Sequence, residues 1–222
     1  MFEFHLVYHN LHNFCVLDLS SFYLDIIKDR LYTSVQDAGI RRSAQTAMNT
    51  VLHALVRLMA PILSFTADEV WGYLKHDGAP FSVHADFFLQ MDDRYRDPEL
   101  ARRWEEVISV RKEVTRVLEV ARKEKTIGHP LSASVALGLS DELMDKLMPF
   151  KDQLRSVFIV SDVSLTPIDT LKEGMESENL PGLKVHVSAS SAGKCERCWV
   201  HDPSVGEDDT HSTLCNRCRN VL

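Results

Sequence analysis

Four cysteines near the C-terminal end of the chain carry the clearest chemical pattern in the sequence. Cys195, Cys198, Cys215 and Cys218 are spaced as C-x2-C-x16-C-x2-C, which lies within the range of structural zinc sites. Two residues between paired cysteines let one tight turn direct both sulfur atoms at one ion, and four thiolates complete the tetrahedron that zinc prefers. The pattern therefore predicts a structural Zn²⁺ with no open position for catalysis. A redox pair, uncommitted thiols and a rubredoxin-like iron site are the alternatives.

Basic residues surround these cysteines and admit two interpretations. They are Lys194, Arg197, Arg217 and Arg219. Cations beside thiolates offset negative charge and depress the thiol pKa values, so these bases could serve the metal site alone. Alternatively, Trp199, directly after the second cysteine, could stack on an unpaired base while Arg197 and Arg217 contact phosphate or base. The other possibility for Trp199 is packing against the body of the protein.

The elements that must position this module read mainly as helices. Apolar residues recur at helical spacing in residues 4–17, 19–32 and 44–62. Thr66 and Glu69 form a capping-box signature for a short helix through Leu74. We expect these helices to pack as an antiparallel bundle over residues 1–96.

The second half of the chain changes its periodicity. After an irregular stretch at 76–96, Asp97 as N-cap and Pro98 at the first helical position predict a long helix to about Glu124. Strands are expected at 134–139, 156–160 and 183–189, with helical pieces near 141–154, a loop at 167–182 and a small-residue linker at 188–193. The predicted layout is mainly α: a helical bundle (1–96), a long helix with an α/β junction (97–190) and a zinc knuckle (191–222).

Composition limits the function classes. A chain of 222 residues with a net charge of −7 has no general affinity for nucleic acid, so any such binding must rest on local patches. No run of about 18 apolar residues and no signal peptide occur in the sequence, so no membrane association is expected. Four cysteines assigned to metal leave Cys15 unpaired, which fits a reducing cytoplasm better than a disulfide scaffold.

Other candidate chemistry is weak. His5, His9 and His12 share a helical face, but no H-E-x-x-H motif provides a general base, and a polar helix face is the simpler interpretation. The glycine-rich phosphate-binding loops and the G-x-S-x-G nucleophile elbow do not occur. The sequence therefore contains no complete active site.

Two further basic features have both a structural and an RNA-binding interpretation. Arg111 interrupts the apolar stripe of the long helix, where a charge is costly unless it is paired or faces a ligand. A structural ion pair or contact with an RNA phosphate would satisfy it. A second group lies around the turn between the second and third helices, where it forms either a mixed solvated surface with nearby aspartates or a phosphate-contacting patch. This group comprises Lys28, Arg30, Arg41 and Arg42.

Several segments carry a family resemblance. Residues 13–32 and 41–71 closely resemble the anticodon-binding helical domain of bacterial isoleucyl-tRNA synthetases, and residues 110–137 resemble the junction that follows it. The motifs KCERCW (194–199) and LCNRC (214–218) resemble the C-terminal zinc peptide of the same family. These segments, in this order, cover nearly the whole chain. Ser132 departs from the glutamate that is common in the family.

The resemblance implies a function for the longer protein. A parent of this kind joins isoleucine to tRNA-Ile with ATP and Mg²⁺, using catalytic and editing domains whose HIGH and KMSKS signatures do not occur here. With Met1 to Phe4 opening inside a helix, we expect an excised C-terminal fragment that is inactive by itself and monomeric. Its partner is then the anticodon stem-loop of tRNA-Ile, with the region from Arg41 to Glu69 on the RNA side and the zinc module at the anticodon.

Two other functions remain as alternatives. One is a non-catalytic paralogue or protein-interaction domain. The other is the zinc-finger DNA-binding module of a DNA glycosylase of the formamidopyrimidine type. Those enzymes commonly begin with Pro-Glu after the initiator and are strongly basic, whereas this chain begins Met1-Phe2-Glu3 and is acidic.

Overall fold

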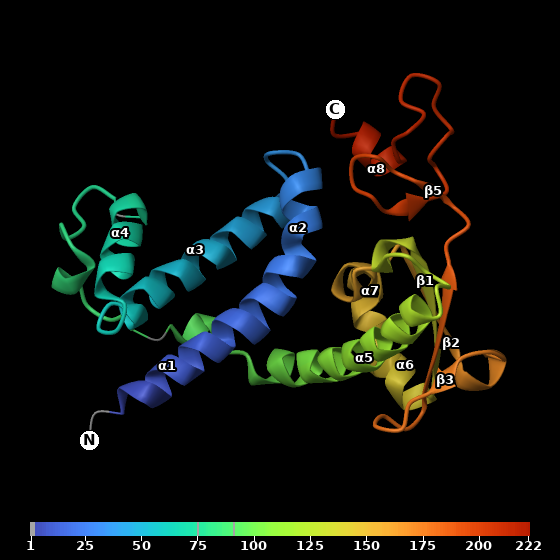
Figure 1. Cartoon of the computed structure of the whole chain (residues 1–222), viewed down its shortest axis with the longest axis horizontal. Coiled ribbons are helices and arrows are strands. Elements are labelled where there is room, and N and C mark those ends of the chain that lie inside the picture. The colour runs from blue at the N-terminus through green and yellow to red at the C-terminus, as the bar shows by residue number, and fades with distance from the viewer. Residues whose placement is uncertain (1–2, 75, 91) are drawn as a thin grey trace. The chain divides into compact units, whose positions relative to one another are not determined.

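The computed structural model describes residues 3–74, 76–90 and 92–222. The chain forms two compact units, Met1–Arg96 and Asp97–Leu222, whose elements are labelled in Figure 1. Helices of all types account for 56% of the described residues, and a small mixed sheet and a cysteine cluster complete the structure. The prediction of a mainly α protein is therefore confirmed, while the division into three domains stays a prediction.

The first helical run of the first unit continues without a break. Helix α1 (Phe4–Asn13), the π-helix η1 (Phe14–Tyr23) and helix α2 (Leu24–Thr33) follow one another directly, as one rod in Figure 1. The prediction of two helices separated near residue 18 is therefore wrong. This stretch contains no glycine or proline, and wider π turns carry the backbone through it, with the hydroxyl of Ser21 donating to the carbonyl of Val16 at 2.7 Å. Met1 and Phe2, included in the expectation of a chain that opens inside a helix, lie outside the described residues.

The core of this unit lies between the next two helices and the loop after them. Helix α3 (Gly39–Met59) returns along α2 and contacts α4 (Ser64–Leu74), as Figure 1 shows. The buried cluster comprises Val56, Ala60, Ala67, Trp71 and Val83. Helix α4 begins at Ser64, so Thr66, the first residue of the predicted capping box, lies inside the helix. The apolar stripe at 44–62 is only partly buried, since Leu52 and Leu58 are exposed.

The irregular stretch that follows α4 is held down by polar contacts. It contains the short 3-10 turns η2 (Val83–Ala85) and η3 (Asp93–Tyr95). Arg57 on α3 pairs with Asp86 at 2.5 Å between Nη2 and Oδ2, and its guanidinium lies 4.6 Å from the centre of the Trp71 ring. The indole Nε1 of Trp71 donates to the carbonyl of Pro80 at 3.0 Å. The loop therefore completes the core of the first unit.

The second unit begins with the long helix α5 (Pro98–Lys123). The Asp97 side chain accepts from the backbone N–H of Leu100 at 2.9 Å, which confirms the predicted N-cap. The helix packs against strand β4 (Leu183–Ala189). Its buried residues are Val107, Val110, Glu113, Val114, Val117, Leu118 and Ala121.

A four-stranded sheet of order β2-β1-β4-β3 supports α5. After the 3-10 turn η4 (Pro130–Ser132), strand β1 (Ala133–Leu139) runs parallel to β2 (Asp162–Pro167) and antiparallel to β4, with Val135 opposite Val163 and Val187. The crossover from β1 to β2 comprises α6 (Asp141–Leu147), η5 (Met148–Phe150) and α7 (Lys151–Phe158). The 3-10 turn η6 (Ile168–Thr170) and the edge strand β3 (Met175–Glu176) lie within the predicted loop at 167–182.

The strand predicted at 156–160 is wrong. Residues Ser156 to Phe158 form the last turn of α7, and Ile159 follows in the left-handed conformation, with φ at 58°. A short apolar run can form either a buried strand or a buried helical turn. Here Leu154, Val157 and Phe158 bury one helical face. The strands predicted at 134–139 and 183–189 are confirmed.

The C-terminal segment is a small module of turns. Strands β5 (Gly193–Lys194) and β6 (His201–Asp202) form a hairpin, and helix α8 (Asn216–Arg219) ends the module. Across the described part of the chain, no helix combines the length and apolar character needed to cross a membrane.

Candidate metal centre and nucleic-acid interface

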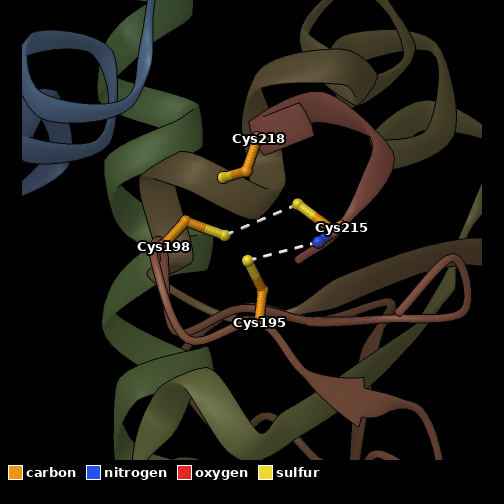
Figure 2. A group of neighbouring side chains, drawn as sticks. All are labelled: Cys195, Cys198, Cys215 and Cys218. Carbon is orange, nitrogen blue, oxygen red and sulfur yellow. Dashed lines mark hydrogen bonds between the residues drawn. The ribbon is translucent and has the colours of Figure 1, made fainter. Parts of the chain in front are cut away.

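The four cysteine side chains converge on one point (Figure 2). Their sulfur atoms all lie within 4.8 Å of one another, and the sulfur atoms of Cys198 and Cys215 are 3.8 Å apart. Zinc–sulfur bonds of about 2.3 Å in a tetrahedron place neighbouring sulfur atoms about 3.8 Å apart. The donor set and its geometry therefore fit a closed zinc site.

Two separate turns bring the cysteine pairs together. In the first, the N–H of Trp199 donates to the carbonyl of Cys195 at 2.8 Å, and the N–H of Cys195 donates to the carbonyl of Val200 at 2.9 Å. In the second, Cys215 precedes the single turn of α8, which carries Cys218. The N–H of Cys215 donates to the sulfur of Cys195 at 3.3 Å, which joins the two turns. Cys195, Cys215 and Cys218 are buried, so the sulfur atoms form the centre of the module.

The electrostatics of the site differ among the cysteines, and the thiolate is favoured at Cys195. Burial raises the pKa of Cys195, but hydrogen bonds from the backbone N–H groups of Cys198, Cys215 and Arg197 lower it to about 6. Burial raises the pKa values of Cys198 and Cys218, and hydrogen bonds from Arg217 and Arg197, respectively, oppose the rise. The two arginines therefore lie against the sulfur atoms, as the charge-offsetting interpretation expects.

Trp199 is presented to solvent in a strained conformation. Its φ of 64° is left-handed, which costs an L-residue roughly 1–2 kcal/mol. The side chain is 60% exposed, so the ring is not packed into the protein body. The ammonium group of Lys194 lies 5.6 Å from the ring centre. Backbone strain of this kind clusters at active sites, ligand clamps and switch regions, so Trp199 is a candidate binding residue.

Arg111 contacts the end of a helix. Its Nε donates to the carbonyl of Val157, in the last turn of α7, at 2.9 Å. That carbonyl is one of the last four of the helix, which have no partner within the helix itself. The guanidinium thus has a structural role through a backbone oxygen, which sequence reasoning did not foresee.

The basic group at the turn between α2 and α3 is interleaved with acids and carbonyls. Lys28 pairs with Asp25 at 2.7 Å, and the exposed Arg42 lies 3.8 Å from Asp37. Arg41 donates through Nη1 to the carbonyl of Ser34 at 3.4 Å, while its buried Nε has no hydrogen-bond partner among the described residues. Arg30 lies close enough to Tyr23 to oppose the rise in tyrosine pKa that burial causes. These contacts support the mixed-surface interpretation.

The histidines at the N-terminus form no metal cluster. In the described ranges, the cysteine group is the single set of three or more potential ligand side chains close enough to hold an ion. His9 and His12 instead lie beside the Tyr8 ring.

Sequence reasoning missed one feature of the second unit. A cavity of about 370 Å³ lies between the turn at 128–132 and the hairpin of the zinc module, and its lining includes His129, Lys194, Trp199 and His201. No motif pointed to it, because its two walls are more than sixty residues apart in the chain.

Comparison with known proteins assigns this architecture to a family. Residues 1–137 match the family described as the anticodon-binding domain of tRNA ligase. Residues 193–221 match the zinc finger found in FPG and IleRS. The first match spans more than half of the chain, and the chain therefore belongs to the anticodon-binding domain family of tRNA ligases.

The individual relatives are isoleucine–tRNA ligases. The chain is 48% identical over 225 residues to the enzyme of Syntrophotalea carbinolica and 45% identical over 224 residues to that of Moorella thermoacetica, with 100% of this chain and 24% of each relative covered. It is 46% identical over 221 residues to the enzyme of Geobacter sulfurreducens, with 98% of this chain and 23% of the relative covered. The chain thus spans about a quarter of these relatives and is homologous to their C-terminal part.

Proposed function

We propose that this chain is the anticodon-recognition part of an isoleucine–tRNA ligase and binds tRNA-Ile. The observation that carries the proposal is the match of the whole chain, at 48% identity, to an isoleucine–tRNA ligase. The anticodon-binding match over residues 1–137 supports the choice of tRNA over DNA. The acidic net charge of −7 also favours an RNA contact confined to local patches over general DNA affinity.

The zinc site has a structural part in this proposal. Four thiolates leave no coordination position for a substrate, so the ion holds the turns that present Trp199 and the basic side chains. The four cysteines would bind one Zn²⁺ per chain. ATP and Mg²⁺ serve the joining reaction of the whole ligase, in which this chain contributes tRNA binding. We place that ligase in the cytoplasm, as a monomer.

The RNA contacts divide between two surfaces. At the zinc module, the exposed Trp199 stacks on an unpaired anticodon-loop base, with Arg197 and Arg217 near enough to add positive charge beside the cysteines. At the turn between α2 and α3, phosphate contacts would come from Lys28, Arg30, Arg41 and Arg42. Arg111 is the weakest candidate, because it already donates to Val157.

Binding to matched nucleic acids tests the proposal. Fluorescence anisotropy would compare the 222-residue chain on labelled tRNA-Ile, a second tRNA and duplex DNA at one salt concentration, since phosphate contacts depend strongly on salt. We expect tightest binding to tRNA-Ile. Preference for the duplex would favour the glycosylase-type module. Absence of binding to all three would favour a protein-interaction domain.

A further inference from the structure

The most exposed large apolar side chains among the described residues gather at one end of the first unit. Phe65 is 93% exposed, and Tyr73, Phe81 and Phe87 are at least 85% exposed. All four lie on α4 or on the loop that packs against it. Exposed apolar residues are ordinary where they are scattered singly, whereas a group of them marks an interaction site. We propose that this aromatic surface docks on the remaining, N-terminal part of the ligase.

Helix α4 turns two of these rings away from the core. Phe65 and Tyr73 are eight residues apart, and residues spaced by four lie on the same side of a helix. Ala67 and Trp71 are buried on the opposite side. Because that buried side fixes the orientation of α4, the two outward rings have no place in the core of the first unit.

The loop presents the other two rings on a fixed backbone. Phe81 lies two residues before Val83, which is 3% exposed in the core and whose N–H donates to a carboxylate oxygen of α4 at 3.2 Å. Phe87 directly follows Asp86, whose carboxylate pairs with Arg57 on α3. The rings are therefore carried by anchored segments, and preorganisation of this kind reduces the entropy cost of docking.

Charge makes RNA an unsuitable occupant of this surface. Residues 64–90 contain four acidic side chains and, among lysines and arginines, only Lys75. Glu69 is exposed between Phe65 and Tyr73 on α4, where it would repel a phosphate backbone, which is bound by cations. The basic group proposed to contact RNA lies at the other end of α3 (Figure 1), about 30 Å away for a helix of this length. The aromatic surface therefore suits a protein partner.

The length of the related ligases identifies that partner. The chain corresponds to 24% of its relatives and is homologous to their C-terminal part, so about three-quarters of such a ligase lies outside it. That part belongs to the same polypeptide, and a tethered partner reaches an effective concentration in the millimolar range. A few rings then suffice for docking. This inference rests on the proposed function, in which the chain is one part of a longer ligase.

Hydroxyl-radical footprinting without tRNA would measure the exposure of each ring directly. The free 222-residue chain would be compared with a hybrid ligase, in which this chain replaces the homologous part of the relative that is 48% identical. We expect modification of Phe65, Tyr73, Phe81 and Phe87 to be several-fold slower in the hybrid. Tyr32, which is 75% exposed near the end of α2, is the control and should be modified at the same rate in both proteins.

Serine substitutions test whether the rings themselves hold the two parts together. In the hybrid, Phe65→Ser combined with Phe87→Ser should return the modification of Tyr73 toward its rate in the free chain, because burial of each phenyl ring contributes about 10- to 150-fold to a docking constant. In the free chain, the same pair should leave the thermal midpoint and the affinity for tRNA-Ile unchanged, since neither ring is buried there. Tyr32→Ser is the matched control and should leave Tyr73 protected in the hybrid.

The outcomes keep docking and tRNA recognition apart. Equal modification of the four rings in the free chain and in the hybrid would overturn the docking surface. A dimer of the free chain that the serine pair dissociates in sedimentation velocity would also overturn it, because the occupant would then be a second copy. Loss of tRNA affinity in the serine pair would assign the surface to RNA instead. If the free chain does not bind tRNA-Ile but the rings are protected in the hybrid, the proposed tRNA recognition is wrong and the docking surface stands.

Discussion

At Trp199, a left-handed backbone conformation coincides with the exposure of a large aromatic ring. Its left-handed φ of 64° has a steric cost that a glycine at the same position would not have. Because its side chain is 60% exposed, burial of the ring offsets little of this cost. Ile159 is also left-handed, with φ at 58°, and it follows the last turn of α7, where helices commonly end in this conformation. The proposed stacking of Trp199 on an RNA base would account for this strain, and Lys194 lies beside the ring.

Trp199→Gly should separate stability from recognition. Removing the ring abolishes stacking worth about 1–3 kcal/mol per base, so tRNA affinity should fall about 5- to 150-fold. Relief of the left-handed strain should keep the thermal midpoint at or above that of the wild-type chain. Trp199→Ala, which retains the strain, should be less stable than Trp199→Gly by about 1 kcal/mol. A glycine variant with wild-type affinity would remove the stacking role.

Ser161 is predicted to act as a positioning residue. Ser161→Ala leaves the carbonyl of Leu131 and the N–H of His201 without this partner, which should lower the free energy of unfolding by about 1–3 kcal/mol. It should also weaken tRNA binding while the zinc content stays at one per chain. The control is Ser164→Ala, at an exposed position of β2. Equal stability of the two alanine variants in urea would contradict this role.

At the scale of elements, one buried carboxylate joins α5 to the loop before β4. Glu113, which is 6% exposed, accepts from the side-chain amide of Asn179 at 2.9 Å and from Nη2 of Arg116 at 3.1 Å. The hydrogen bond from Asn179, more than that from Arg116, lowers the pKa of Glu113 although burial raises it. The acidic loop predicted at 167–182 is therefore anchored to the helix.

The stability supplied by Glu113 should depend on pH. Because the pKa of Glu113 is lower in the folded state, the unfolded chain binds the proton first as pH falls. The stabilisation is therefore complete above the ordinary glutamate pKa and is lost as pH falls from there through the lowered folded-state pKa. Glu113→Gln should therefore cost about 1–2 kcal/mol at pH 7 and less below about pH 4. Urea unfolding at both pH values measures this. Glu119→Gln, in an exposed pair with Arg122 on the same helix, should change stability by less than about 0.5 kcal/mol, and an equal loss in both variants would contradict the anchor.

At the scale of the whole molecule, the zinc module depends on its metal more than the other parts do. Its buried cluster is Cys195, Cys215 and Cys218, with Cys198, Val205 and Leu214 packed against it. A core of this size cannot order a segment of about thirty residues without a metal or disulfide staple. The helical core around Trp71 and the sheet under α5 have apolar cores of their own.

Cys215→Ser should therefore unfold the module selectively. We expect loss of zinc and loss of amide dispersion over residues 195–219, while far-ultraviolet circular dichroism falls only slightly because α3 and α5 remain helical. In the wild-type chain, acidification should release zinc, since the ligands must be thiolates. A Cys15→Ser variant is the matched control. Zinc retention with an unaltered C-terminal spectrum in Cys215→Ser would show that the site is not needed for folding.

Local sequence determined the features that depend on neighbouring residues. The paired cysteines at C-x2-C spacing, the Asp97 cap with Pro98, and the strands at 134–139 and 183–189 are set by turn geometry, capping and apolar runs, and each is present in the structure. The likeness of residues 1–137 and 193–221 to known domains likewise follows from the order of residues alone.

Tertiary structure decided what depends on distant partners. Residues Ser156 to Phe158 are helical because α7 buries one face in the second unit, and Arg111 donates to the carbonyl of Val157, 46 residues away. Ser161 joins the turn at 131 to the hairpin at 201, which are two segments that line the cavity. Such contacts are set by strand register and packing across the fold, so no local sequence pattern encodes them. The cysteines could be predicted as metal ligands because the two members of each pair are only three residues apart.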